Sequence, residues 1–417
     1  MIKVFKFGGF SLSTADNIKH LSRIIRQVDN DQLLIIVSAM GKTTDALEKL
    51  CSAYVSNKDK APALLEEIKH FHEQLMYELF QRTDHAVFDE VANTFIEIEW
   101  MLEDDPHPNF DFNYDQIVSI GELISSKIIS AYLKECGIEN KWLDARGYIQ
   151  TDNTYREGII DREKTAASIR SLGSESKIYI SQGFIGGTSE NFTTTLGREG
   201  SDYSAAVFAS ALQAESLTVW KDVPGLMNAD PALFNTAVKY DELPYSEALE
   251  LAYYGANIIH PKTIKPLRNA GIPLFVKPFL NPEEKGTKIH KTAKPNTDTP
   301  AIIVKKKQVL LTISTRDFSY MDESCLSWLL RAFADAHIKL NMMSLSALSV
   351  SVCFDQDSLK LKKLTEHLEE RFQFTGTEDL ELLTVLYYKP EDIKILSAGR
   401  TILMEQFSKN TAQLVMR

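Results

Sequence analysis

The chain of 417 residues is short of cysteine, of positive charge and of long apolar runs. Its four cysteines, Cys51, Cys136, Cys325 and Cys353, are scattered and form no C-x-x-C pair, so we expect neither a disulfide framework nor a cysteine metal site. The formal net charge of −11 argues against a nucleic-acid partner, which would favour a basic surface. An anionic substrate is still compatible with this charge, because local fields can oppose the net charge.

Signals for membrane insertion and export are also missing. No apolar stretch reaches the roughly 18 residues needed to span a membrane. The N-terminal residues 1–6 are unlike a signal peptide, because the apolar run is short and broken by lysines. We therefore expect a cytoplasmic protein without a membrane contact.

Strands and helices alternate through the first two thirds of the chain. A strand is expected over 3–7, then a helix with N-cap residues over 11–16 and apolar residues at helical spacing from Ile18 to Val28, and a strand over 33–38 whose continuous apolar run suits burial on both faces. Residues 61–136 have helical spacing, interrupted by an acidic, proline-containing loop over 104–114. Further strands are expected over 177–181, 217–221 and 272–277. This order predicts one α/β domain over 1–288.

A second region follows an aperiodic linker over 286–300. A strand over 309–314, a helix over 325–337, two strands within 339–354 and a helix over 359–372 give the order of a ferredoxin-like α+β unit. We place this unit at 301–375. The remaining 380–417 contain a strand, an ambiguous middle and two final strands, too little for a full second copy.

The segment Lys6-Phe7-Gly8-Gly9-Phe10-Ser11 is the first pattern that can carry chemistry. Its glycines would let backbone N–H groups approach a phosphate, and Lys6 would add positive charge for a transferred phosphoryl group. A plain strand-to-helix turn would need the same glycines. Gly41-Lys42-Thr43 is not a P-loop, because Ile36 occupies the position of its first glycine. Thr44 could donate a hydroxyl group or merely cap a helix.

Two glycine-rich loops form the richest pattern. Residues 183–187 follow a strand, and Gly197-Arg198-Glu199-Gly200-Ser201-Asp202 opens a helix of small residues. Arg198 is suited to bind a carboxylate or phosphate in a bidentate manner. Asp202 could orient a lysine or a metal-bound phosphate, or could simply interact with the helix dipole.

Two further segments are compatible with a ligand. Residues 221–225 follow a strand, where α/β sheets bind nucleotides, although Pro224 and Gly225 would also suit an ordinary turn. Glu122 begins a helix and could bind a substrate ammonium or interact only with the helix dipole.

Taken in order, these motifs resemble the aspartokinases, within the wider amino-acid kinase family. The ordered segments are Lys6-Phe7-Gly8-Gly9 with Ser11, Val37-Ser38-Ala39-Met40-Gly41, Ser119-Ile120-Gly121-Glu122, Gln182-Gly183-Phe184, Leu196-Gly197-Arg198, Gly200-Ser201-Asp202, Asp222-Val223-Pro224-Gly225, Ala229-Asp230-Pro231, Tyr254-Gly255-Ala256 and His260-Pro261. Each segment alone is weak, whereas the ordered set is specific and covers nearly the whole chain.

The resemblance implies a three-layer α/β sandwich with a mainly parallel sheet. It also implies phosphorylation of the β-carboxylate of L-aspartate with ATP and Mg²⁺, the first step towards lysine, threonine and methionine. The implied roles are catalysis by Lys6 and Asp202; substrate binding by Ser38, Thr44, Glu122, Arg198 and Ser201; and ATP binding by Lys6, Gly8, Gly9, Ser11, Lys221, Asp222 and Met227.

The chain departs from the family pattern mainly on the nucleotide side. Lys221 stands where the family often has threonine, and Met227, Ala232 and Asn257 replace a usual tyrosine, arginine and lysine. Glu199 replaces a common glycine. We hypothesise that Lys221 or Lys262 supplies replacement positive charge.

The second region resembles the ACT regulatory domains of aspartokinases. ACT domains commonly pair between chains and bind an amino acid, which implies a homodimer and feedback inhibition by lysine or threonine. Met321, Asn341 and Ser346 are the implied effector residues, and 380–417 would be an abbreviated second ACT-like unit.

Two alternatives to an aspartate kinase stay open on the sequence. One is an amino-acid kinase for another carboxylate substrate, and the other is a catalytically degenerate amino-acid sensor. We expect no fused homoserine dehydrogenase, because no dinucleotide fingerprint is present before Arg417.

Overall fold

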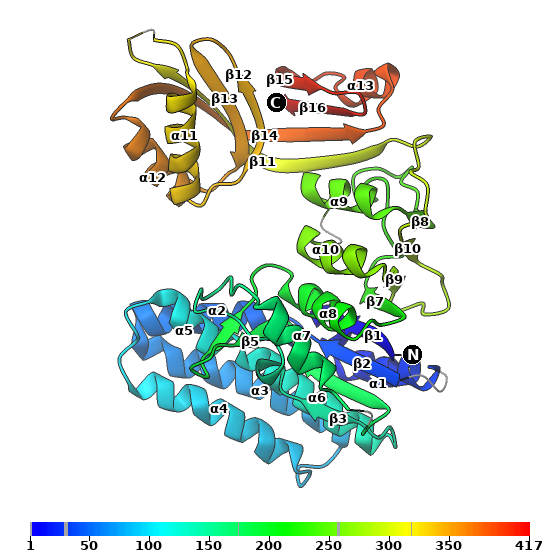
Figure 1. Cartoon of the computed structure of the whole chain (residues 1–417). Coiled ribbons are helices and arrows are strands. Elements are labelled where there is room, and N and C mark those ends of the chain that lie inside the picture. Colours follow the sequence, from blue (N-terminus) through cyan, green and yellow to red (C-terminus); the bar gives the residue numbers. More distant parts are fainter. Residues whose placement is uncertain (1, 29–31, 174, 257–258, 318) are drawn as a thin grey trace. The chain divides into compact units, whose positions relative to one another are not determined.

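The computed structural model describes residues 2–28, 32–173, 175–256, 259–317 and 319–417 (Figure 1). The chain divides into two compact units. The first comprises Met1–Leu226, Lys239–Leu249 and Ile258–Pro295, and the second comprises Met227–Val238, Glu250–Asn257 and Asn296–Arg417. No helix in the described ranges combines the length and apolarity that a membrane crossing requires.

An eight-stranded sheet organises the first unit, in the order β3-β4-β2-β1-β7-β9-β10-β8. Its strands are β1 (Ile2–Phe7), β2 (Gln32–Val37), β3 (Lys141–Leu143), β4 (Ile178–Gln182), β7 (Ser216–Lys221), β8 (Glu242–Leu243), β9 (Leu274–Pro278) and β10 (Thr287–Ile289). The central strands β3, β4, β2, β1, β7 and β9 are all parallel to their neighbours, while β10 runs antiparallel to β9. The mainly parallel sheet expected from the sequence is confirmed.

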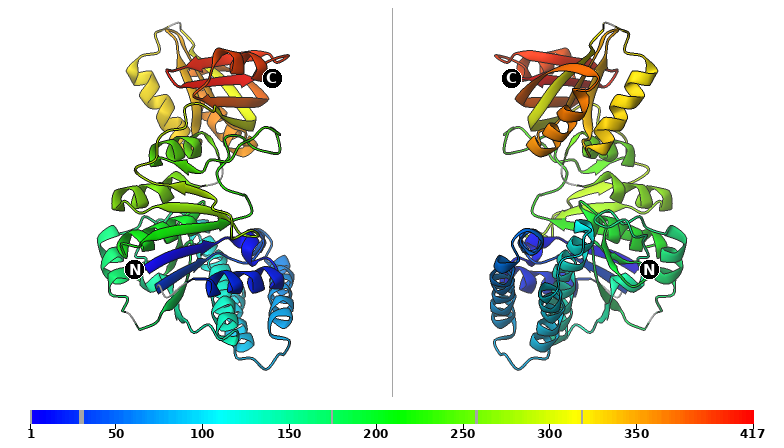
Figure 2. Two further views of the ribbon diagram at one scale, coloured as in Figure 1. Left: turned by 90° about the vertical axis from the view of Figure 1, so that its right-hand side faces the viewer. Right: turned by 90° about the vertical axis from the view of Figure 1, so that its left-hand side faces the viewer.

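Helices cover both faces of this sheet and complete the expected three layers (Figure 2). Among them, α6 contacts β2, β3 and β4, and α8 contacts β1, β2 and β7. The helices up to residue 270 are α1 (Ala15–Arg26), α2 (Thr43–Ser56), α3 (Ala61–Phe80), α4 (Val87–Glu103), α5 (Phe110–Val118), α6 (Ile120–Glu135), α7 (Arg162–Arg170), α8 (Gly200–Ala211), α9 (Tyr245–Tyr254), whose residues are divided between the two units, and α10 (Pro261–Ala270). Alternation along β1 sends Phe5 and Phe7 into the core shared with α1, α3 and α4. Lys6 therefore points to the opposite face, where α8 lies against β1.

Two expectations for the first unit need correction. The loop expected over 104–114 is shorter, because the Asn109 side chain accepts a hydrogen bond from the Asp111 N–H and caps α5. The linker expected over 286–300 begins with a strand, since β10 pairs with β9 and β8. Its three residues are too few to produce a readable alternation.

A six-stranded antiparallel sheet organises the second unit, in the order β12-β13-β11-β14-β16-β15. The elements are β11 (Ala301–Thr315), α11 (Glu323–Asp335), β12 (Leu340–Leu345), β13 (Ser349–Asp355), α12 (Ser358–Leu368), β14 (Phe372–Leu386), α13 (Pro390–Leu396), β15 (Ile402–Phe407) and β16 (Thr411–Met416). The two expected helices and the paired strands within 339–354 are present. Phe372, expected at the end of a helix, instead begins β14 and is buried.

Strands β11 and β14 are each 15 residues long and run through both halves of this sheet. Residues 308–315 of β11 pair with 372–380 of β14 beside β13, whereas residues 301–305 pair with 382–386 beside β16. The ambiguous middle of 380–417 is helix α13, and the two final strands are β15 and β16. The half of the sheet formed by residues 380–417 thus contains one further strand, residues 301–305 of β11, which pairs with β14.

Candidate active site

The candidate site lies at the carboxyl ends of neighbouring parallel strands, where open α/β sheets bind ligands. Hydrogen bonds join these ends across the sheet: Ser38 N–H donates to Phe7 O at 3.1 Å, and Gly183 N–H donates to the Val37 carbonyl at 2.8 Å. Gly41 N–H also donates to Gly9 O at 3.0 Å. The motifs near residues 8, 38 and 183 therefore meet at one edge.

Asp202 binds two lysines at this edge. Its Oδ1 lies 2.6 Å from Lys6 Nζ, and its Oδ2 lies 3.2 Å from Lys221 Nζ. Lys6 comes from β1 and Lys221 ends the adjacent strand β7, while Asp202 lies in the first turn of α8. The sequence placed Lys221 on the nucleotide side, and the structure joins it directly to the catalytic pair expected from Lys6 and Asp202.

The two lysines keep this buried aspartate charged. Burial alone would raise the pKa of Asp202, but the charges of Lys6 and Lys221 outweigh it and lower that pKa. Burial likewise disfavours the charged form of Lys221, yet Asp202 and Glu199 raise its pKa. The cluster consequently holds two ammonium groups next to one carboxylate, a charge distribution that can accept an anionic ligand.

Glu122 is a second buried acid, in the first turn of α6. Its Oε1 accepts a 3.3 Å hydrogen bond from Ala39 N–H, while its Oε2 has no hydrogen-bond partner among the described residues. Burial raises the pKa of Glu122 to about 8, although the Ala39 N–H and the charge of Lys6 oppose the rise. An unpartnered buried carboxylate oxygen is unfavourable, and a cationic ligand would satisfy it.

Glycine is required where the loops approach each other. A Cβ added to Gly183 would lie 2.6 Å from the Cβ and 2.7 Å from the Cα of Ser201, so the start of α8 could not keep its place. A Cβ on Gly9 would lie 2.7 Å from the carbonyl oxygen of Gly41. Beside this loop the buried hydroxyl of Ser11 has no hydrogen-bond partner among the described residues, so it is available to a ligand.

The loop before α8 presents Arg198 to solvent. Arg198 is exposed and forms no ion pair within the described ranges of the chain. Glu199 adopts a positive φ of 52° at the N-cap of α8, and burial raises the pKa of its carboxyl, opposed first by Lys221. Glu199 and Lys221, the two residues here that differ from the family pattern, thus interact electrostatically.

Asp115, which the sequence motifs did not indicate, supports this loop from α5. Its Oδ2 accepts 2.9 Å hydrogen bonds from the backbone N–H groups of Thr195 and Arg156, and its Oδ1 accepts a 2.6 Å bond from the Thr195 hydroxyl. Burial raises the pKa of Asp115 to about 6. Since Thr195 lies three residues before Arg198, Asp115 fixes the chain that enters the loop.

The remaining expected residues have varied surroundings. Ser201 is buried, Ser38 and Thr44 are half-buried, and Asp222 is exposed. Met227 belongs to the second unit. Lys262 is an exposed residue in the first turn of α10. Asn257 lies outside the described residues.

The expected effector residues belong to the second unit. Met321 N–H donates to Ala347 O at 2.9 Å, next to Ser346 in the turn between β12 and β13. Asn341 is already engaged by other side chains, because it accepts from Lys305 at 2.9 Å and donates to Asp355 at 2.9 Å.

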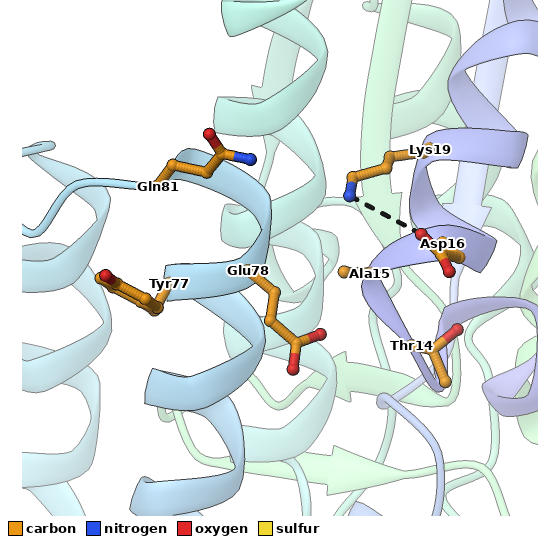
Figure 3. Close-up of a pocket in the computed structure, with 7 residues that line it drawn as sticks. All are labelled: Thr14, Ala15, Asp16, Lys19, Tyr77, Glu78 and Gln81. Carbon is orange, nitrogen blue, oxygen red and sulfur yellow. Dashed lines mark ion pairs between the residues drawn. The ribbon is translucent and has the colours of Figure 1, made fainter.

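A separate cavity of about 590 Å³ lies between the start of α1 and the end of α3 (Figure 3). Its charged lining contains both signs, with Lys19 paired to Asp16 at 3.6 Å and Glu78 on the facing helix. It contains none of the expected site residues.

Comparisons with known proteins agree with this geometry. The profile of the amino acid kinase family matches residues 1–278. Aspartokinase 1, chloroplastic, of Arabidopsis thaliana is 31% identical over 451 residues, which cover 98% of this chain and 78% of that protein. The bifunctional aspartokinase/homoserine dehydrogenase 2 of the same plant is 30% identical and matches 89% of this chain, which spans only 42% of that relative's length.

A solved structure extends the agreement to the whole fold. E. coli aspartokinase III in complex with aspartate and ADP has a TM-score of 0.86 and 25% identity, covering 100% of this chain and 96% of that chain. The same enzyme in complex with lysine and aspartate has a TM-score of 0.81 and 25% identity, covering 99% and 95%. The chain therefore belongs to the amino acid kinase family and, within it, to the aspartokinases.

Proposed function

We propose that this protein is an aspartate kinase, which transfers the γ-phosphoryl group of MgATP to the β-carboxylate of L-aspartate and forms 4-phospho-L-aspartate. The observation that carries the proposal is the pair of opposite charge environments at one edge of the sheet. Lys6 and Lys221 offer positive charge to phosphates, and Glu122 offers an unpartnered carboxylate oxygen to an ammonium group.

Aspartate would be held at both ends. Glu122 would bind its ammonium group and the exposed Arg198 its α-carboxylate, with Ser38, Thr44 and Ser201 lining the site. The β-carboxylate is itself the nucleophile, so the reaction needs no general base. Positioning and neutralisation of charge supply the catalysis.

The phosphates would lie against the loop after β1. Lys6 would stabilise the transferred phosphoryl group, while Gly8, Gly9 and the Ser11 hydroxyl, which has no partner among the described residues, would contact the nucleotide. Asp222 and Met227 are the proposed contacts on the remainder of ATP. Mg²⁺ would arrive bound to the phosphates of ATP.

The second unit is proposed to be regulatory and dimeric. We assign 1–288 to the catalytic domain, 301–375 to an ACT-like domain and 380–417 to an abbreviated second one. Both edge strands of its sheet expose apolar side chains, with Leu345 of β12 53% and Phe407 of β15 48% exposed, which favours pairing with a second copy. Lysine or threonine would be the effector, bound near Met321, Asn341 and Ser346. The four free cysteines suit a reducing cytoplasmic compartment.

One assay tests the activity. Purified protein is incubated with MgATP, hydroxylamine and either L-aspartate, L-glutamate or no amino acid, and the hydroxamate is measured. We expect product with aspartate alone. Product with glutamate instead would overturn the substrate assignment, and no turnover with any amino acid would favour a sensor. Addition of lysine or threonine to the same assay tests regulation.

A further inference from the structure

A second cavity, of about 240 Å³, lies in the helical layer of the first unit. Three helices line it: α8 lies in contact with both α7 and α10 (Figure 1). The lining residues are Ile160, Arg162, Thr165, Ala166, Arg170, Tyr203, Val207, Ser210, Ala211, Lys265, Pro266 and Asn269. Apart from Ile160, which precedes α7, the lining residues of each helix are adjacent or three to four positions apart, so each helix contributes one face.

The charge of this cavity is one-sided. Arg162, Arg170 and Lys265 line it, and no aspartate or glutamate does. None of the three forms an ion pair with a carboxylate among the described residues. All three cations are exposed, and Arg170 Nε also donates to the Ala211 carbonyl at 3.4 Å. In a chain whose formal net charge is −11, the cavity thus has a local surplus of solvent-accessible positive charge. The cavity in Figure 3, by contrast, contains charges of both signs.

The rest of the lining suits a small organic molecule. Val207, Ala166 and Pro266 offer apolar surface, while Ser210 and Asn269 offer hydrogen bonds. Arginine guanidinium groups bind phosphate and carboxylate groups through paired donors, and the volume admits a small metabolite.

We propose that the cavity between α7, α8 and α10 is a binding site for a small polyanion that carries two or more phosphate or carboxylate groups. The site is distinct from the candidate active site, and its binding does not depend on the proposed function, whereas its effect on catalysis rests on that function. Arg162 and Arg170 of α7 and Lys265 of α10 hold the anionic groups from opposite sides of α8.

The site has a direct connection to the catalytic cluster. Tyr203 in the cavity wall follows Asp202 in the sequence, and consecutive residues of a helix point about 100° apart. One turn of α8 therefore presents Asp202 to the lysines and Tyr203 to the cavity. A ligand that tightens the packing of α8 would alter the position of Asp202 and hence the rate of phosphoryl transfer.

Calorimetric titration tests the site with pyrophosphate and citrate as probes. MgADP and L-aspartate are present in excess, so that the active site is filled. The variants are Arg162→Gln/Arg170→Gln and, on a different helix, Lys265→Gln. The matched control is Lys164→Gln, which removes one positive charge from α7 at a residue that does not line the cavity.

We expect at least one probe to bind the wild type and the control with Kd below about 1 mM, and to bind the double variant at least about tenfold more weakly. Binding of pyrophosphate alone or citrate alone assigns the anionic group as phosphate or carboxylate. Equal binding to all variants, or no binding of either probe at about 10 mM, overturns the proposal. If the double variant does not fold, the binding of the same probes to Lys265→Gln decides the question.

Discussion

Aspartate binding should release a proton from Glu122, and the size of this effect follows from the structure. The carboxyl of Glu122 is buried and its pKa is raised to about 8, so most molecules hold it neutral at pH 7 before substrate binds. The ammonium group of aspartate requires the ionised form. At a pKa of about 8, binding at pH 7 should therefore release about 0.9 proton per aspartate.

The same linkage fixes the direction of the pH dependence. A raised pKa means that the charged, binding-competent carboxylate gains population as pH rises, so affinity for aspartate should increase towards alkaline pH. The increase should be about ninefold from pH 6 to pH 7 and about fivefold from pH 7 to pH 8, and should level off above the pKa of about 8.

Isothermal titration calorimetry in buffers with different ionisation enthalpies measures the released protons directly. Glu122→Gln preserves the shape of the side chain but cannot ionise, so we expect its proton release to fall to about zero and its affinity to weaken about tenfold to a hundredfold. Glu139→Gln, which changes an exposed acid outside the site, is the control and should behave as wild type. Wild-type binding that releases no proton at pH 7 and has constant affinity between pH 6 and pH 8 would refute the reasoning.

Three further predictions concern the framework of the site. Lys221→Met should lower kcat about tenfold or more, because it removes one of the two cations on Asp202; an unchanged kcat in steady-state assays would contradict this role. Gly183→Ala should destabilise the fold by about 1–3 kcal/mol in urea denaturation, because the new Cβ would lie 2.6 Å from a side-chain atom of α8, whereas Gly147→Ala, with nothing within 4 Å, should not. Asp115→Asn should raise KM for aspartate with little change in kcat, and as pH falls below about 6 the wild-type KM should rise more steeply than that of the variant, which keeps only the dependence on Glu122.

The sequence predicted the strands of the catalytic core well, because buried parallel strands are continuous apolar runs. Residues 33–38 are such a run, and β2 occupies Gln32–Val37. The resemblance also paired Lys6 with Asp202, and the two side chains do form an ion pair of 2.6 Å, beside loops in which glycine is required for space. Gly183 shows the reason, because no side chain fits against Ser201.

What the sequence did not predict depends on contacts between distant residues. Asp115 lies in an ordinary helix without a motif, and its role arises only when Thr195, 80 residues later, donates two hydrogen bonds to it. Lys221 was expected on the nucleotide side, and its ion pair with Asp202 could not be read from the sequence, because Asp202 lies 19 residues earlier on α8 while Lys221 ends β7. The sequence also underestimated the length of strands, because the strand expected over 309–314 is only the second half of β11. The first half of β11 pairs with residues more than 70 positions further along the chain, which no local pattern reveals.

The long strands β11 and β14 limit how the C-terminal unit can be recombined. Each belongs to two neighbouring parts of the sheet, so a cut anywhere between residues 315 and 380 would separate strand partners in both parts. Transplanting only one part to another protein would leave the strands of that part without their hydrogen-bonding partners. The smallest segment that keeps every strand pair of this sheet is therefore residues 301–417, and chimeras with boundaries inside it should aggregate.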